Sequence, residues 1–349
     1  MTAAPSVNYG HETMRSGEVM KSVTSQEIWN LVYQAVRRAG FIDPVAQPLA
    51  DATTDAELRG KPSVGLDHLF YYFQAATSHM INVAPNVRHQ SITPSMSVLD
   101  ADHGPMQFAY RQAEAAIVDA ARTHGIAILL IKNAFAGGEL GYYARRLAQH
   151  DILSIAMANS PAVMSVGGSY ERLVGTNPLS YGVPIGDARA VVIDQASSST
   201  ARANFQKYAQ QWEPIPEGWA LDKRGQPTTN AAAALAGTLL PFGGYKGGNI
   251  ALLVEFMAML GGGDSSYEAA PYYTGQRQQG IGASIIAIDT HKLPGYTGRI
   301  DALVQGFTRD HGSKIRVTEL FVGDRRVEVP TYLWTQLQHY VKNGPVEAS

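Results

Sequence analysis

The chain of 349 residues is long enough for one large domain or two ordinary ones and for a sizeable hydrophobic core. Hydrophobic residues make up 45% and charged residues 17%, and the formal net charge of −2 argues against nucleic acid or an anionic membrane surface as a partner. The absence of cysteine excludes disulfides, thiolate metal sites and cysteine nucleophiles, and it fits a reducing cytoplasm.

The first elements in the chain are predicted to be helices. Residues 1–21 are expected to form a flexible polar tail without the apolar core of a signal peptide, so we expect a cytoplasmic protein. Thr24 and Glu27 have the spacing of a capping box, and the apolar periodicity after them predicts a helix that ends at Gly40. A second helix is expected over residues 43–60.

A third helix is predicted from the stretch K-P-S-V-G-L-D-H-L-F-Y-Y-F at residues 61–73. Its apolar residues recur at helical spacing and form one stripe, made by Leu66, Leu69, Phe70 and Phe73. His68 projects from nearly the opposite side, one turn after Val64. A histidine on the polar side of an amphipathic helix is ordinarily solvated. This stretch alone therefore leaves open whether His68 is a solvated surface residue or a residue that takes part in catalysis.

The middle and later parts of the chain mix strands with helices, which indicates an α/β or α+β protein. A helix is predicted over 106–123, and further helices start near residues 141, 230 and 249. Buried strands are predicted at 126–131, 154–158, 190–193 and 283–288. The common dinucleotide, P-loop, metalloprotease and serine-hydrolase motifs are missing, and we expect no metal site.

Three uncommon segments could bind a ligand. L-V-G-T-N-P-L-S-Y-G at 173–182 is either a plain turn or a turn that exposes amides. V-V-I-D-Q-A-S-S-S-T-A at 191–201 carries Asp194 to the end of a strand, where ligands often bind in α/β proteins, although Asp194 could simply cap a helix. L-P-F-G-G-Y-K-G-G-N at 240–249 suits an anion near backbone amides, or is a helix-entry loop with a solvated lysine.

In this order the segments resemble a known family. The chain resembles the malate/L-lactate dehydrogenase-like oxidoreductases, the type-2 lactate dehydrogenases. The motifs that carry the resemblance are A-E-L-R-G at 56–60, G-T-N-P, D-Q-A-S-S, E-G-W-A-L-D with P-T-T, and G-G-Y-K-G. The resemblance runs from about residue 22 to 340. It implies a cofactor, NADPH or NADH, and a small 2-oxo acid, 2-hydroxy acid or cyclic imino acid as substrate.

The resemblance also implies a non-Rossmann α/β fold and a homodimer with the active site at the subunit interface. We expect a mostly antiparallel sheet domain that binds the cofactor, over residues 86–229 and 276–329. A discontinuous helical domain for substrate binding and dimerisation is expected over 22–85, 230–275 and 330–349.

The sequence departs from the family at both signature histidines. The family's S-H-G-x-x-R motif falls on S-V-G-L-D-H, so Ser63 is kept, Val64 stands at the catalytic histidine and His68 at the arginine that binds the substrate carboxylate. The second histidine position is Ala136. Loss of a general acid–base typically removes about 10²–10⁴ in rate. His68, with an ordinary pKa near 6.5, and Asp194, with a pKa raised by desolvation, are the expected substitutes.

The expected site residues follow from this alignment. The catalytic candidates are His68, Asp194 and Ser63, and the substrate-binding candidates are Ser63, His68, Tyr72 and Thr176. The cofactor-binding candidates are Asn159, Ser160, Thr176, Asn177, Ser197, Ser198, Lys246 and Arg325.

These residues favour an NAD(P)H-dependent reductase of a small cyclic imine or 2-oxo acid with an altered acid–base site. The alternatives are a non-redox cyclase, isomerase or lyase on the same scaffold, favoured by the loss of both histidines, and an inactive dimer with a binding or regulatory role. Cofactor binding separates the reductase from both alternatives.

Overall fold

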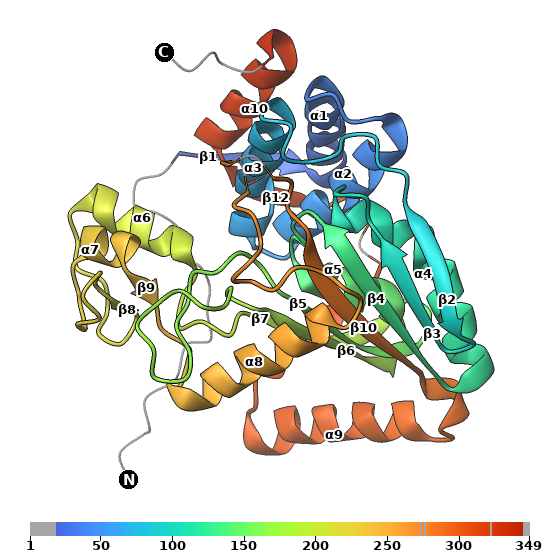
Figure 1. The fold of residues 1–349 in the computed structure, drawn as a ribbon. Helices are drawn as coiled ribbons and strands as arrows, with labels where there is room; N and C mark the ends of the chain where they lie inside the picture. The colour runs from blue at the N-terminus through green and yellow to red at the C-terminus, as the bar shows by residue number, and fades with distance from the viewer. Residues whose placement is uncertain (1–18, 273, 276, 322, 345–349) are drawn as a thin grey trace.

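The computed structural model describes residues 19–344 except 273, 276 and 322. Helices from both ends of the chain form one layer at the top of Figure 1: α1 (Ser25–Arg38), α2 (Asp43–Leu58), α3 (Leu66–Thr77) and α10 (Thr331–Asn343). They share one hydrophobic core, and α10 packs against α1. The short strands β1 (Met20–Thr24) and β12 (Arg326–Pro330) pair antiparallel and join the two chain ends.

The first two N-terminal helices begin where the sequence predicts, whereas the third begins at Leu66, five residues after the start of the predicted stretch 61–73. Thr24 caps α1 and Glu27 returns the bond, so the capping box is present. Helix α2 begins at Asp43 with Pro44 in its first turn, where proline costs no hydrogen bond. Between α2 and α3 the chain makes one 3₁₀ turn, η1 (Pro62–Val64).

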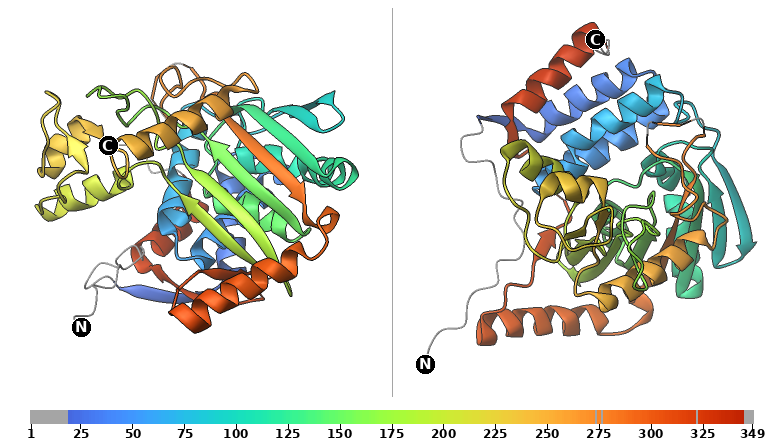
Figure 2. Two further views of the ribbon diagram at one scale, coloured as in Figure 1. Left: turned by 90° about the horizontal axis from the view of Figure 1, so that it is seen from below. Right: turned by 60° about the vertical axis from the view of Figure 1, so that its left-hand side comes forward.

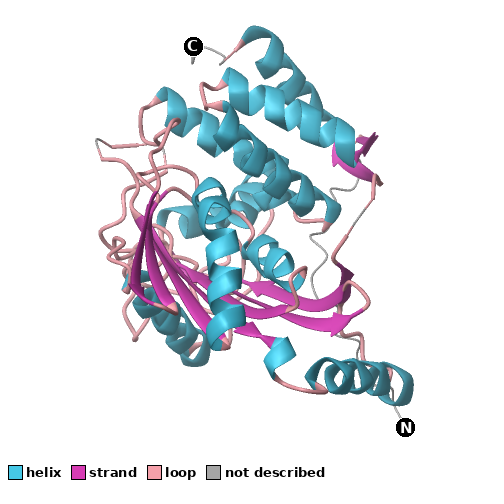
Figure 3. Ribbon diagram, turned by 90° about the vertical axis from the view of Figure 1, so that its right-hand side faces the viewer, coloured by secondary structure: helices cyan, strands magenta, loops and turns pink. Residues whose placement is uncertain are grey.

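An eight-stranded, mostly antiparallel sheet forms the second layer. Its strand order is β11-β7-β6-β5-β10-β4-β3-β2, and β3 and β4 are its parallel neighbours. The bounds in chain order are β2 (Arg88–Thr93), β3 (Met96–Asp100), β4 (Ile126–Ala134), β5 (Ile152–Ala158), β6 (Leu179–Gly186), β7 (Arg189–Gln195), β10 (Ile281–Asp289) and β11 (Val317–Glu319). This arrangement confirms the expected non-Rossmann α/β fold. Figure 3 shows the helical layer beside the twisted sheet.

Helices cover both faces of this sheet. Alternate residues of a strand point to opposite faces. Ile285 and its neighbours at period two pack with α4 (Met106–His124) and α5 (Leu140–Ala148), whereas the hydroxyl of Ser284 donates to Met257 in α8 (Tyr245–Met259). Figure 1 accordingly shows α8 in front of the sheet and α4 and α5 behind it.

A smaller unit projects beside the sheet (Figure 2, left). It contains α6 (Arg202–Gln211), β8 (Ala220–Leu221), α7 (Ala231–Ala236) and β9 (Thr238–Leu239) around a separate hydrophobic cluster. Helix α9 (Tyr296–His311) follows the 3₁₀ turn η2 (Thr290–Lys292) and lies along β6.

The packing of residues 230–275 differs from the expected domain division. We expected this stretch to join the N-terminal helices, but α7 packs with α6, and α8 packs on β10, β5 and β4. Helix α8 is apolar around most of its circumference, so its sequence did not reveal which layer it covers. The exact domain boundaries remain a prediction.

The polar, proline-containing passage near 84–105, in which the sequence predicts no strand, contains the hairpin of β2 and β3. All six residues of β2 are exposed, so the strand lacks the alternation that marks a half-buried strand. Within the described residues, the structure has no helix that is long and apolar enough to cross a membrane.

Candidate functional site

The three uncommon segments lie side by side at one edge of the sheet. The Ser197 amide donates to the carbonyl of Thr176 (2.7 Å), and the Phe242 amide donates to the carbonyl of Ser197 (3.0 Å). Ser198 and Pro241 form an isolated β-bridge between the second and third segments. The fold therefore brings the G-T-N-P turn, the hydroxyl-rich segment and the glycine loop together.

The glycine loop fits an anionic cofactor group. Gly243 and Gly244 have φ values of +57° and +65°, and a Cβ on either would meet no atom within 4 Å. Lys246 is exposed in the first turn of α8, where free amides and the helix dipole also favour an anion. Backbone amides and one lysine are thus available for the phosphates of a nicotinamide cofactor.

Two predicted cofactor residues have their side chains committed elsewhere. The Asn177 amide donates to the carbonyl of Ala251 (2.9 Å) and to Glu255 (2.7 Å), and the Asn159 amide donates to the carbonyl of Asp264 (2.8 Å). Both asparagines are buried. Their side chains organise the turn around Glu255, so contact with a cofactor is left to their backbone.

The other predicted cofactor residues also form contacts within the protein. The hydroxyls of Ser197 and Ser198 donate to the carbonyls of Asn177 and Thr200 (both 2.8 Å), which fixes the loop after β7. Ser160 is hydrogen-bonded to Tyr272. Arg325 lies beside the start of α1 and is paired with Glu319 on the surface. Its role at a nucleotide stays a prediction.

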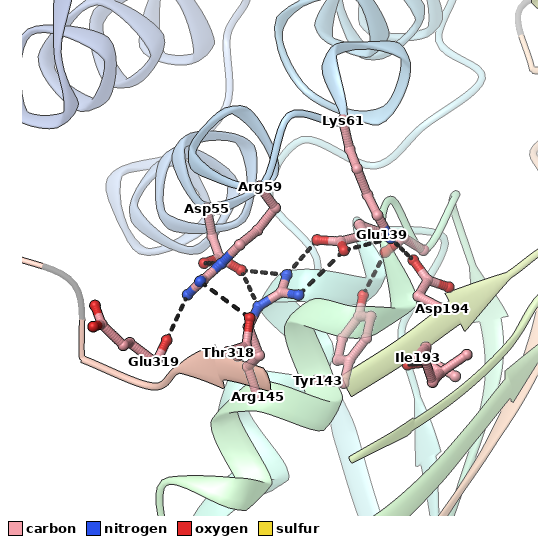
Figure 4. A network of polar contacts seen from close by, with 12 residues as sticks. Asp55, Arg59, Lys61, Glu139, Tyr143, Arg145, Ile193, Asp194, Thr318 and Glu319 are labelled. Carbon is pink, nitrogen blue, oxygen red and sulfur yellow. Dashed lines mark hydrogen bonds and ion pairs between the residues drawn. The ribbon is translucent and has the colours of Figure 1, made fainter. Parts of the chain in front are cut away.

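Asp194, at the end of β7, contacts a lysine that the sequence reasoning missed. The Lys61 ammonium lies 2.9 Å from an Asp194 oxygen and 2.8 Å from a Glu139 oxygen (Figure 4). Lys61 directly follows the glycine that closes A-E-L-R-G, and Glu139 directly precedes α5. The amide of Gly141 also donates to Asp194. The one sequence feature that could have revealed Lys61 is its position next to the family's catalytic motif.

The network continues away from Lys61 through alternating charges. Arg145 is ion-paired with Glu139 and donates to Asp55 (2.7 Å). Asp55 in turn pairs with Arg59 (3.3 Å), whose guanidinium reaches the carbonyl of Glu319 (3.1 Å). Figure 4 shows this chain of contacts running from α2 across α5 to the sheet edge. Three cations therefore balance three carboxylates in a largely buried site.

Burial and these partners set the protonation states. Burial raises the pKa of the Asp194 carboxyl; Lys61 opposes the rise and Glu139 adds to it. Burial alone would lower the pKa of Lys61, but Asp194 and Glu139 together raise it above its ordinary value. Burial opposes ionisation of Glu139 as well, yet Arg145 and Lys61 hold its pKa low. The expected rise for Asp194 is confirmed, and Lys61 is a protonated ammonium at neutral pH.

Two cavities meet at Glu139. One of about 190 Å³ is lined by Lys61, Glu139, Arg145 and Asp194. The other, of about 10 Å³, is lined by Val64, His68, Tyr72, Gln107 and Glu139. Ser63 lies in η1, between Lys61 and Val64. The candidate catalytic residues thus gather around the end of α2 and the start of α5.

The His68 side chain is only partly exposed and is not an ordinary solvated surface residue. Its ring lies 5.3 Å from that of Tyr71, 5.4 Å from Tyr72 and 6.2 Å from Tyr272, and its Nε2 atom is buried. Burial lowers the pKa of His68 to about 4. The expected pKa near 6.5 was therefore wrong, because the tyrosines exclude the water that stabilises an imidazolium. A neutral His68 is neither a ready proton donor nor a cationic anchor.

This depressed pKa predicts acid-sensitive stability. The unfolded chain binds a proton at His68 below about pH 6.5, but the folded chain does so only below about pH 4. The stability that the folded protein gains from keeping His68 neutral is fully present above pH 6.5 and is lost as the pH falls toward 4. The loss reaches about 3 kcal/mol at most.

The variant His68→Phe keeps a ring among the tyrosines and removes the titration. Urea denaturation at pH 7, 6 and 5 should give a smaller loss of unfolding free energy for this variant than for the wild type. Parallel pH curves for the two proteins would contradict the buried, neutral histidine.

Among the described residues, no group of three or more His, Asp or Glu side chains is placed to hold a metal ion. The site is therefore built from an ammonium, carboxylates, hydroxyls and backbone amides. Such groups can move a proton, hold a polar substrate and bind an anionic cofactor.

Comparison with known proteins agrees with this geometry. Residues 23–328 match the family model for malate/L-lactate dehydrogenase. The chain is 30% identical over 327 residues to the (2R)-3-sulfolactate dehydrogenase (NADP(+)) of Chromohalobacter salexigens, covering 92% of this chain and 98% of the relative.

Two reductases are also similar. The Delta(1)-pyrroline-2-carboxylate/Delta(1)-piperideine-2-carboxylate reductase of Pseudomonas aeruginosa is 29% identical over 330 residues, covering 91% of this chain and 98% of the relative. The crystal structure of delta1-piperideine-2-carboxylate reductase from Pseudomonas syringae pvar. tomato superposes with a TM-score of 0.79 at 25% identity, covering 94% of this chain and 96% of that one. The chain belongs to the malate/L-lactate dehydrogenase family.

Proposed function

We propose that the protein is an NAD(P)H-dependent reductase of a small cyclic imine or 2-oxo acid, in which Lys61 supplies the proton that the family takes from a histidine. As a family member whose relatives are named dehydrogenases and reductases, the chain is an NAD(P)-dependent oxidoreductase that acts on a small molecule. The altered acid–base group is specific to this sequence, which has Val64 and Ala136 at the two histidine positions.

The observation that carries the proposal is the position of Lys61 between Asp194 and Glu139. Its ammonium is protonated and borders the cavity of about 190 Å³. The Lys61 side chain is 29% exposed, so it can exchange protons with solvent, whereas the Glu139 side chain is only 1% exposed. Lys61 is thus the proton carrier of the cluster, and Glu139 and Asp194 hold its ammonium in place.

The chemistry divides between the cofactor and the protein. A bound NADPH or NADH supplies hydride to the carbon of a C=O or C=N bond. For a 2-oxo acid, an N–H of Lys61 then protonates the alkoxide oxygen, and the resulting amine takes a new proton from solvent. For an imine, the iminium nitrogen already carries its proton, so the reduction needs no proton from Lys61.

The residues that would hold the cofactor are those of the converging segments. The backbone of 175–178 and 197–199, the amides of Gly243 and Gly244, and Lys246 fit a phosphate-bearing cofactor. We further propose a homodimer with the active site at the subunit interface. The cysteine-free sequence supports the proposal that the enzyme acts in the cytoplasm.

Cofactor binding tests this function. A ligand at about 100 times its dissociation constant stabilises a protein by about 2.7 kcal/mol, so NADPH or NADH should raise the melting temperature by several degrees. Lys246→Met should weaken this shift, whereas Lys223→Met, which removes an exposed lysine elsewhere, should leave it unchanged. Absence of a shift with any nicotinamide at millimolar concentration would contradict the proposal.

A second candidate is a non-redox cyclase, isomerase or lyase. The observation in its favour is the pair of Asp194, with a raised pKa, and protonated Lys61, which could act as base and acid without a cofactor. This candidate predicts turnover in the absence of nicotinamide that Asp194→Asn abolishes. Turnover that strictly requires NADPH or NADH would exclude it.

A further inference from the structure

The small cavity beside the candidate site contains polar atoms without partners. It lies between α2, α3 and α4, and its volume of about 10 Å³ is close to that of one water-sized group. Two buried atoms of its lining residues, Gln107 Oε1 and His68 Nε2, make no hydrogen bond with any residue in the described part of the chain. A buried polar group without a partner costs free energy, so their joint presence on one cavity points to a ligand group that bonds both.

The hydrogen bonds of Gln107 decide what kind of group this is. The amide nitrogen of Gln107 donates to the hydroxyl of Tyr72 (2.9 Å), and that hydroxyl donates to the carbonyl of Ala136 (3.2 Å). This orientation leaves the oxygen of Gln107 free, and a carbonyl oxygen only accepts. The cavity therefore offers an acceptor held in place by Tyr72, and its natural complement is a donor.

The charges around the cavity also disfavour an anion. Glu139 lines the same cavity and is ionised, because Arg145 and Lys61 hold its pKa low. Its cationic partners lie on the side of the larger cavity, which Lys61 and Arg145 line. His68 is neutral, so it can accept a hydrogen bond through Nε2 but does not offset the negative charge. A carboxylate in this cavity would face an acceptor and a carboxylate.

We propose that the cavity formed by His68, Tyr72, Gln107 and Glu139 is a specificity pocket for a hydrogen-bond donor of the substrate beside the reacting bond, such as a hydroxyl or an amide N–H. This inference rests on the proposed reductase function and narrows its substrate class. Among the C=N and C=O compounds that the enzyme reduces, it prefers those that carry such a donor beside the reacting carbon over those that carry a carboxylate there.

A matched substrate series tests the pocket. Four cyclic imines would share one ring and differ in the group on the reacting carbon, which would be carboxamide, hydroxymethyl, methyl ester or carboxylate. The first two donate a hydrogen bond and the last two only accept. We expect kcat/KM with NADPH or NADH to be about 10- to 100-fold higher for the donors than for the ester and the carboxylate.

Variants assign the preference to the pocket. His68→Phe keeps the ring packing and removes the polar nitrogen, so it should reduce the donor preference several-fold or more. Gln107→Leu removes the other hydrogen-bonding group that lines the pocket, so it should also reduce the donor preference several-fold or more. His89→Phe, a change of the same kind at an exposed residue of β2, should leave the preference unchanged. His68→Arg should shift the preference toward the carboxylate.

The possible results distinguish a failure of the pocket assignment from a failure of the proposed reductase function. If the melting temperature rises with cofactor and the carboxylate is the best substrate, the pocket assignment is wrong and the reductase function stands. If the donors are preferred but the preference survives in both His68→Phe and Gln107→Leu, the pocket is also wrong. If no nicotinamide binds and none of the four imines is reduced, both proposals fall.

Discussion

Replacing Lys61 by methionine should lower kcat/KM for the reduction of a 2-oxo acid by about 10²–10⁴-fold, the usual loss when a general acid is removed. The methionine keeps the length and the apolar stem but carries no proton. Reduction of a preformed iminium should fall less, because that substrate brings its own proton. The comparison of the two substrates in one variant separates proton transfer from a general loss of structure.

The pH profile provides a second readout for Lys61. Because Asp194 and Glu139 raise the pKa of Lys61, the wild-type rate should decline only on the alkaline side, above the ordinary lysine range. Lys61→Met should lose that decline. Lys132→Met is the matched control, since Lys132 is also partly exposed and near a carboxylate, and it should change the rate less than about twofold. Equal rates for Lys61→Met and the wild type would exclude Lys61 as the proton donor.

Replacing Arg145 by methionine should lower the free energy of unfolding by about 3–5 kcal/mol. The Arg145 side chain is 6% exposed and pairs with both Glu139 and Asp55. Its loss leaves buried carboxylates without a counterion, and this uncompensated charge is the main cost. Urea denaturation with an unchanged m-value would measure the change.

A surface pair provides the control for Arg145. Arg309 pairs with Asp310 at 2.6 Å, but its side chain is 74% exposed, so Arg309→Met should leave the unfolding free energy nearly unchanged. Adding Glu139→Gln to Arg145→Met should restore part of the lost stability, because it removes one of the unpaired charges. A loss below about 1 kcal/mol for Arg145→Met would show that the network is not buried as described.

Much of the fold could be predicted because its local signals agree with its tertiary contacts. The capping box at Thr24 marks α1, and Gly125 in the left-handed conformation ends α4. The apolar runs of β4, β5 and β10 read as buried strands because these strands lie in the middle of the sheet. Exposed β2 and the uniformly apolar α8 gave no such signal, and their places depend on tertiary packing.

The candidate site was predictable only where one segment carried the information. Asp194 stood out because a strand delivers it to the site. Lys61 and Glu139 are far apart in the sequence, and each looks like an ordinary surface charge until the fold pairs them. Patterns within one segment of the sequence cannot predict such a long-range ion pair.

His68 was misjudged for a related reason. Its place on the helix opposite the main apolar stripe suggested solvent, but α3 has a second contact surface. Tyr272, from the chain that follows α8, joins Tyr71 and Tyr72 to enclose the imidazole. That contact comes from a distant segment, and periodicity within one helix cannot predict it.

The most direct test of the account is isotope transfer from the cofactor. NADPH and NADH deuterated at both C4 positions of the nicotinamide would be incubated with the protein and, in separate reactions, with the cyclic imine series or a 2-oxo acid, and the product masses would be measured by mass spectrometry. The account predicts a reduced product that contains a single cofactor deuterium, with a much lower yield of reduced oxo acid from Lys61→Met. A product without deuterium, or turnover that proceeds equally well without cofactor, would contradict it.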